Sequence, residues 1–269
     1  MANFYDTITE AIRDIEAHGF DSEQRITRWI GLIEQAAKDS MMPEHVVNQA
    51  LSGMMQGIYK KMIERGGIMK MHKGISRFTI DRLSPKLRNE LDRRIMASAQ
   101  LIKLNRQQAI AQTIQRFSGW ASSIPAGGSK AVDVMDVKAN LKKSFSAQTY
   151  EYRRVAIDQG HKLVASLNEI IAVDGGAIAG EWNSHWRQKN YSFRPDHKAR
   201  DGKVYAIRGN WALEKGLMTK GAGYYDDMTA AGEEPFCRCS ITWIHNLRDL
   251  PESMLTAKGE KALEAARMQ

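Results

Sequence analysis

Two short segments in the last third of the chain combine residue types that can do chemistry. The first reads RPDHKARDGKVY and contains His197 and Asp201, and the second reads GEEPFCRC and contains both cysteines of the chain, Cys237 and Cys239. On an extended segment, residues two positions apart share a face, so both thiols would lie on one face with Arg238 on the other. The Asp-Gly pair in the first segment is typical of a tight turn.

Metal binding is the first chemistry that these side chains could support. Two thiolates and an imidazole are zinc ligands, so Cys237, Cys239 and His197 would form a zinc-like site with one further ligand, such as Asp201 or His185. The usual structural motif separates its cysteines by two residues, whereas one residue separates them here. Because this spacing departs from the usual motif, we expect no resident cofactor. If the cluster does bind a metal, zinc is the candidate.

A metal-dependent nuclease or related hydrolase is the second interpretation. There His197 or His185 would act as a general base, and Asp196 or Asp201 would orient it or bind the metal. In the third interpretation the cysteines are small buried apolar residues, and His197, Asp201 and Arg238 form a polar clamp that fixes the loops. Because acids and histidines are often neighbours by chance, we favour the clamp and expect a protein without catalytic residues.

The positive charge of the chain is confined to one stretch. The 269 residues carry a net charge of +8, but residues 60–116 alone hold 14 Lys and Arg against four acids. With few aromatic residues and no base-reading motif, this stretch predicts contact with nucleic-acid phosphate or an acidic protein surface. The alternative is a solvated helix surface without a partner. The candidate contact residues are Lys60, Lys61, Arg65, Lys70, Lys73, Arg77, Arg82, Arg88, Arg93 and Arg94.

The composition excludes several classes of protein. Two cysteines cannot supply the disulfide framework of a small secreted protein. No apolar run approaches the roughly 20 residues of a membrane-spanning helix, and the acidic, amphipathic start is unlike a secretory signal. We expect a protein that is made in the cytoplasm and has no membrane partner.

The elements that must position these residues are predicted from hydrophobic spacing. Apolar stripes, N-caps and terminating glycines predict six helices. The first ends at residue 19, the second begins at residue 21, and the others cover residues 43–66, 86–118, about 133–145 and about 147–173. The fourth of these would begin at Ser84-Pro85, with the serine as N-cap and the proline at the first helical position. Three strands follow, within 177–186, 203–207 and 239–245, and a final helix covers about 256–267.

These elements predict an α+β fold. We expect a mostly α-helical N-terminal half with long helices, and a small α+β C-terminal domain with short antiparallel strands. The turn-rich sequence SSIPAGGS marks the division between them. Residues 1–125 are therefore predicted to be a helical docking and assembly region, and residues 126–269 the C-terminal domain.

The order of the motifs resembles the C-terminal domain of phage Mu F-like minor head proteins, also called phage head morphogenesis proteins. In that family a helical segment rich in arginine precedes a His-x-x-x-Asp-Gly motif, and a Pro-x-Cys-Arg-Cys motif follows. The resemblance covers roughly residues 100–250 and includes the later segment NLRDLP. The matching positions are Arg153 and Arg154, then His197, Asp201 and Gly202, and then Pro235, Cys237, Arg238 and Cys239.

The resemblance implies a structural protein of the virion rather than an enzyme. It would be made in the host cytoplasm and act in head morphogenesis, at the portal vertex or the capsid interior, in several copies per particle. Its partners would be the portal protein or other head proteins, with packaged double-stranded DNA as a further contact. We expect the helical region to dock and the basic stretch to add salt-sensitive attraction.

Overall fold

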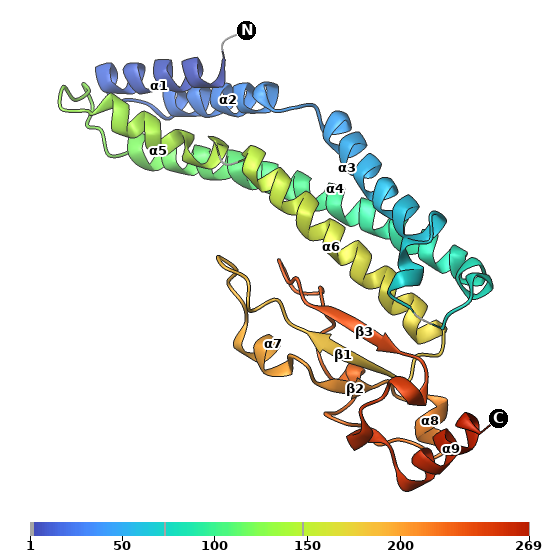
Figure 1. Ribbon diagram of the computed structural model, residues 1–269. Helices are drawn as coiled ribbons and strands as arrows, with labels where there is room; N and C mark the ends of the chain where they lie inside the picture. Colours follow the sequence, from blue (N-terminus) through green and yellow to red (C-terminus); the bar gives the residue numbers. More distant parts are fainter. Residues whose placement is uncertain (1–2, 73, 147, 269) are drawn as a thin grey trace. The chain divides into compact units, whose positions relative to one another are not determined.

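The computed structural model describes residues 3–72, 74–146 and 148–268 and has an α+β fold (Figure 1). Long helices make up most of the N-terminal part, and a small antiparallel sheet lies in the C-terminal region. The predicted fold class is therefore confirmed. No helix in the described part of the chain is long and apolar enough to cross a membrane.

The residues form two compact units, and each unit is discontinuous in sequence. Unit 1 comprises Met1–Leu51 and Ala97–Ala156, and unit 2 comprises Ser52–Met96 and Ile157–Gln269. Helices α3, α4 and α6 contribute residues to both, because the chain passes between the units within these helices. The predicted functional division at residue 125 stays a prediction.

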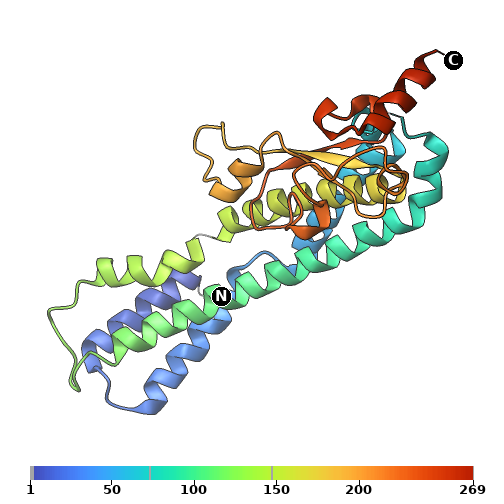
Figure 2. The same cartoon turned by 90° about the horizontal axis from the view of Figure 1, so that it is seen from below.

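Unit 1 is a bundle of helices. Figures 1 and 2 show α1 (Phe4–His18), α2 (Glu23–Ser40), α5 (Val134–Ser146) and the C-terminal part of α4 (Arg77–Ala121) lying side by side. Their apolar stripes meet in one core, as the helical spacing predicts. The largest fully buried members of that core are Phe4, Ile8, Ile12, Ile15, Ile33 and Phe117.

The turn between α1 and α2 is fixed by local chemistry. Gly19 ends α1 with φ of 71°, a conformation in which a side chain would be strained. Ser22, rather than the neighbouring Asp21, caps α2 by accepting a hydrogen bond from the Arg25 N–H. Asp21 instead accepts a hydrogen bond from Arg25 Nε at 2.9 Å. Helix α2 therefore begins two residues after its predicted start at residue 21.

Helix α4 begins earlier than its proline suggests. It starts at Arg77 rather than at Ser84-Pro85, and Pro85 lies inside the helix. A proline in a helix lacks one main-chain donor, but Ile80 and Leu83 continue the buried stripe upstream of it. We infer that the burial of these two side chains offsets the cost of the proline. The helix has 45 residues, about 67 Å at about 1.5 Å per residue.

The helical part of unit 2 contains two tight segments. Helix α3 (Glu44–Tyr59) is followed by a π-helical turn, η1 (Lys60–Glu64), and a 3-10 turn, η2 (Gly67–Lys70). The regular α-helix therefore ends at Tyr59, seven residues before the predicted end at residue 66. Helix α6 (Gln148–Asp174) agrees closely with its predicted bounds.

The sheet of unit 2 has three antiparallel strands in the order β2-β1-β3. They are β1 (Ala179–Asn183), β2 (Val204–Ala206) and β3 (Ser240–Ile244), and each lies within its predicted segment. Gly180, in the middle of β1, is paired with Trp243 of β3. A Cβ on Gly180 would lie 2.5 Å from the Ile241 side chain, so the close approach of these strands requires glycine.

Short elements surround the sheet. The helices α7 (Pro195–Arg200) and α8 (Trp211–Glu214) lie between β2 and its neighbours in sequence, and α9 (Ala257–Arg267) closes the described chain. Three further 3-10 turns are η3 (Tyr225–Asp227), η4 (Leu247–Asp249) and η5 (Glu252–Met254). Two buried clusters hold these segments to the sheet, and one of them contains Trp182, Trp243 and both cysteines.

We predict that Phe117→Ala and Phe78→Ala, two substitutions on α4, differ sharply in cost. Phe117 is fully buried and Phe78 is 76% exposed. The first should lower the free energy of unfolding by about 3–5 kcal/mol, and the second should change it by less than about 0.5 kcal/mol. Urea denaturation of both variants checks this; equal destabilisation would contradict the core assignment in unit 1.

Candidate functional site

His197 is positioned by a short helix that its sequence defines. Pro195 occupies the first turn of α7, where its missing N–H is not needed, and the preceding Arg194 is extended. The helix buries the His197 side chain to 2% exposure, with its ring edge-on to Trp182 at 5.3 Å between centroids. The imidazole is thus held in the core beside the sheet.

The Asp-Gly pair forms the predicted turn between α7 and β2. Asp201 has φ of −54° and ψ of 125°, Gly202 has φ of 73°, and the Lys203 N–H donates to the Arg200 carbonyl at 2.9 Å. These features define a type II turn, whose third residue favours glycine. Gly202 is therefore required by backbone geometry.

Asp201 anchors a loop and does not face the thiols. Its carboxylate accepts hydrogen bonds from the Ser184 N–H and the Trp186 Nε1–H, both at 2.8 Å, and lies 3.3 Å from Arg187. The hydrogen bond from Trp186, then that from Ser184, holds the pKa of Asp201 below its usual value. The structure assigns Asp201 to loop positioning and does not place it among the groups that could share a metal with the cysteines.

The two cysteines precede β3 on an extended segment. Both are buried, at 1% and 5% exposure, while Arg238 between them is exposed. The predicted placement of both thiols on one side is confirmed. Phe236, just before Cys237, has φ of 59°, which is unusual for a residue with a side chain, and its N–H donates to Asp158 Oδ1 at 2.6 Å.

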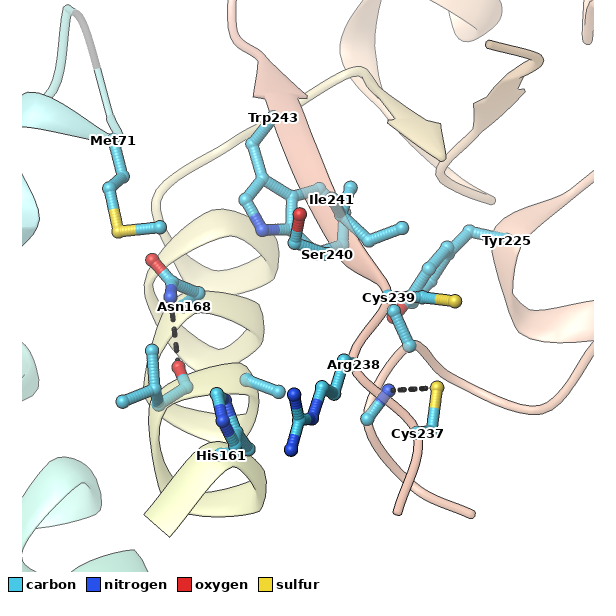
Figure 3. Close-up of a pocket in the computed structure, with 14 residues that line it drawn as sticks. Met71, His161, Asn168, Tyr225, Cys237, Arg238, Cys239, Ser240, Ile241 and Trp243 are labelled. Atoms are coloured by element: carbon cyan, nitrogen blue, oxygen red, sulfur yellow. Dashed lines mark hydrogen bonds between the residues drawn. The ribbon is translucent and has the colours of Figure 1, made fainter. Parts of the chain in front are cut away.

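The imidazole and the two thiols converge. His197 Nδ1 lies 3.5 Å from the Sγ of Cys237 and 3.5 Å from the Sγ of Cys239, and all three atoms lie within 4.8 Å of one another. The Gly232 N–H donates to Cys237 Sγ at 3.4 Å, a bond drawn in Figure 3. Side chains from two motifs some forty residues apart therefore form one buried cluster, which we call the His-Cys-Cys cluster.

The thiols of the His-Cys-Cys cluster hold their protons unequally. A hydrogen bond from Cys239 stabilises the Cys237 thiolate and lowers the pKa of Cys237 to about 5, while the same interaction raises the pKa of Cys239. The Cys237 thiol is therefore the more readily deprotonated of the two. A thiolate, a thiol and an imidazole in this arrangement can bind a soft or borderline metal ion.

A small cavity adjoins the cluster. Its volume is about 90 Å³, and Figure 3 shows it between α6 and the segment that leads into β3, with His161 and Arg238 on opposite walls. That volume accommodates a few water molecules and is well below the roughly 300 Å³ of a ligand pocket. The cavity is therefore too small to bind a large substrate.

The remaining candidates from the sequence have separate roles. His185 packs edge-on against Tyr191 at 5.4 Å between ring centroids. Asp196 accepts a hydrogen bond from Arg200 at 2.9 Å and lies 3.8 Å from His197 Nε2. The Pro235 carbonyl accepts a hydrogen bond from Arg194, which ties the second motif to the first. Among the described residues the three-residue clamp is not formed. His197 faces the two thiols, Asp201 accepts hydrogen bonds from Ser184 and Trp186, and Arg238 lies over the Tyr191 ring.

Three contributors to the site were missed by sequence reasoning. Glu234 lies 3.5 Å from His197 Nε2 and pairs with Arg194, Gly232 donates to a thiol, and Asp158 fixes Phe236. Glu234 and Gly232 belong to the GEEPFCRC motif and could have been suspected from it. Asp158 lies on α6, and nothing in its local sequence connects it to the cysteines.

The basic stretch is partly neutralised by ion pairs. Glu90, buried on α4, pairs with both Arg93 and Arg94 at 2.6 and 3.1 Å. Arg77 and Arg88 pair with Asp81 and Asp92 one turn along the helix. In the described part of the chain, the exposed candidates that form no ion pair are Lys60, Lys61, Arg65, Lys70 and Arg82; Lys73 lies outside the described residues.

Comparison with known protein families, curated proteins and solved structures finds no match for this chain. The resemblance to Mu F-like proteins therefore rests on the sequence motifs alone. Any functional conclusion has to come from the site itself.

A second group of polar side chains in the core of unit 2 is centred on His72. His72 is fully buried, with Nε2 at 3.0 Å from Asn168 Oδ1 and Nδ1 at 3.4 Å from His245 Nε2. Asn168 Nδ2 donates to the Val164 carbonyl, which fixes its oxygen toward His72. Burial lowers the pKa of His72 to about 4 and also lowers the pKa of His245.

We predict that His72 makes the protein acid-sensitive. His72 takes up a proton near pH 6.5 in the unfolded chain but only near pH 4 in the folded chain. Its neutral imidazole therefore contributes to the free energy of unfolding above pH 6.5, and this contribution is lost as the pH falls toward 4. The loss should be on the order of 2–3 kcal/mol. Unfolding free energies measured from pH 7.5 to 4.5 should fall less in His72→Gln, whereas the exposed His45→Gln should behave as the parent; an unchanged slope in His72→Gln would refute the assignment.

We predict that Asp201 stabilises the loop between β1 and α7. Asp201→Ala leaves the Ser184 N–H and the Trp186 Nε1–H without their acceptor and should cost about 1–3 kcal/mol. Asp226→Ala removes an exposed carboxylate that pairs with Arg208 and should cost less than about 1 kcal/mol. Chemical denaturation compares the two; an equal cost would mean that Asp201 does not hold the loop.

Proposed function

We propose that this protein is a structural component of a bacteriophage head that acts in head morphogenesis as a Mu F-like minor head protein. The observation that carries the proposal is the convergence of its two motifs. His197 comes from the first motif and Cys237 and Cys239 from the second, and their side chains meet in one buried cluster. Because the cluster is buried and is built from the motif residues, it supports a structural module better than a surface-exposed active site.

The contacts of the other motif residues support a structural role. Asp201 fixes the loop after β1, Gly202 forms the turn into β2, and the Pro235 carbonyl is held by Arg194. Asp201, Gly202 and Pro235 thus shape the C-terminal part of unit 2. The proposed partners are the portal protein or other head proteins, which would meet surfaces outside this cluster.

A hydrolase centred on the same residues has less support. A catalytic metal needs an open coordination position that a substrate can reach. The His-Cys-Cys cluster is at most 5% exposed, and the adjoining cavity of about 90 Å³ is too small for a nucleotide. Asp201, the acid proposed to orient the histidine, is engaged by Ser184 and Trp186 instead.

The role in assembly is tested on particles. We expect an epitope-tagged chain to purify with procapsids of the phage that encodes it, and image reconstruction to place it at the portal vertex or on the inner capsid wall. Deleting its gene should yield misassembled or DNA-free heads. Intact infectious heads that contain none of the protein would overturn the proposal.

The salt-sensitive attraction is tested with the basic residues that have no ion pair. The triple variant Lys60→Ala, Lys61→Ala and Arg65→Ala should weaken binding to duplex DNA and reduce the slope of log K against log salt by about 2–3. A charge-matched control replaces the exposed residues Lys220, Lys261 and Arg267 and should leave the slope unchanged. Equal effects of the two variants in a binding titration would argue against a localised polyanion-binding surface.

A further inference from the structure

The donor atoms of the His-Cys-Cys cluster are spaced like three corners of a tetrahedral metal site. With metal–sulfur bonds of about 2.3 Å and metal–nitrogen bonds of about 2.0–2.1 Å, a tetrahedron separates nitrogen from sulfur by about 3.5 Å. Nδ1 of His197 lies 3.5 Å from both sulfur atoms. Because the two sulfur atoms also lie within 4.8 Å of each other, one ion placed between these atoms could contact all three donors.

The chemistry of the donors selects the ion. Two thiolates with one imidazole suit zinc, whereas magnesium and calcium take oxygen ligands. All three side chains are buried, so a bound ion would be shielded from competing ligands in solution. We propose that His197, Cys237 and Cys239 bind one zinc ion that fastens α7 to the segment entering β3.

The surroundings of the cluster support a bound cation. The Gly232 N–H donates to the sulfur of Cys237, a contact that stabilises a thiolate. On the far side of the ring, His197 Nε2 is buried and has no hydrogen-bond partner within the described chain, but Glu234 Oε2 lies 3.5 Å away. A carboxylate behind the histidine is the usual outer partner of a metal-bound imidazole, because it fixes the ring and raises its basicity.

The fourth position falls to solvent. The cluster brings together no fourth His, Cys, Asp or Glu within the described residues, and the Ser184 hydroxyl lies 3.9 Å from Cys239 Sγ. With three protein donors, the fourth position of the ion would be left to a water molecule, and the burial of the cluster would keep that position out of reach of a substrate of nucleotide size. The ion joins segments some forty residues apart around a three-stranded sheet, so its binding energy adds to the stability of the folded C-terminal region.

The first experiment uses the full chain. Protein purified without chelators should contain one zinc per chain by elemental analysis. After the metal is removed, adding zinc should raise the thermal midpoint by about 5–10 °C when free zinc exceeds its dissociation constant about 100-fold. Cobalt added to the same apoprotein should give the absorption of thiolate-to-cobalt charge transfer. This result does not depend on the virion role.

Variants assign the ligands. His197→Ala, Cys237→Ser and Cys239→Ser should each lose bound zinc, and the exposed His45→Ala should retain it in full. Glu234→Gln should keep the fold and bind zinc about 10–100-fold more weakly, since only the outer partner of the histidine changes. This variant remains informative if a ligand variant fails to fold.

Either of two results overturns the proposal. One is a parent protein that contains no zinc, shows no thiolate-to-cobalt absorption and is not stabilised by added zinc. The other is zinc that remains stoichiometric when Cys237 and Cys239 are both replaced by serine, because the metal would then be bound elsewhere.

Discussion

The C-terminal region of this protein depends on burying three polar side chains together. An imidazole and two thiols lie within 4.8 Å of one another in the core. The surrounding features serve this constraint: a proline opens the short helix that carries His197, and the left-handed backbone of Phe236 precedes Cys237. Polar groups in a core are stable only when their partners are in place, so this cluster ties local backbone geometry to the fold of the whole region.

Sequence reasoning predicted the elements better than the contacts. Helical stripes and alternating segments placed the strands and most helices, because burial imposes those periods on the sequence. The predicted start of α4 at Ser84-Pro85 was wrong because the buried apolar stripe also extends upstream of Pro85, to Ile80 and Leu83. Both motifs were recognised as one site, but Asp201 and His197 could not be assigned to different partners. That choice depends on Trp186 and Ser184, whose positions only the folded chain defines.

The sequence also could not show which positive charges of residues 60–116 remain accessible in the folded protein. Counting residues gave ten excess positive charges in one segment, but the fold places acids against many of them. Neighbouring pairs such as Arg77 with Asp81 are visible from helical spacing, whereas Lys86 with Asp174 joins residues 88 positions apart. The accessible positive surface is therefore smaller than the composition suggests, and it centres on residues around the π-helical turn η1.

The interleaving of the two units has a consequence for how the chain folds. Residues 52–96 belong to unit 2 but are synthesised before residues 97–156, which belong to unit 1. Contacts of unit 2 therefore span a long intervening segment, and closing such loops costs entropy before any contact forms. A fragment that begins at residue 126 would lack His72 and the first turns of α4, and would expose the surfaces that they cover. The order of synthesis thus favours unit 1 as the earlier folding nucleus, with unit 2 completed only when the last strand emerges.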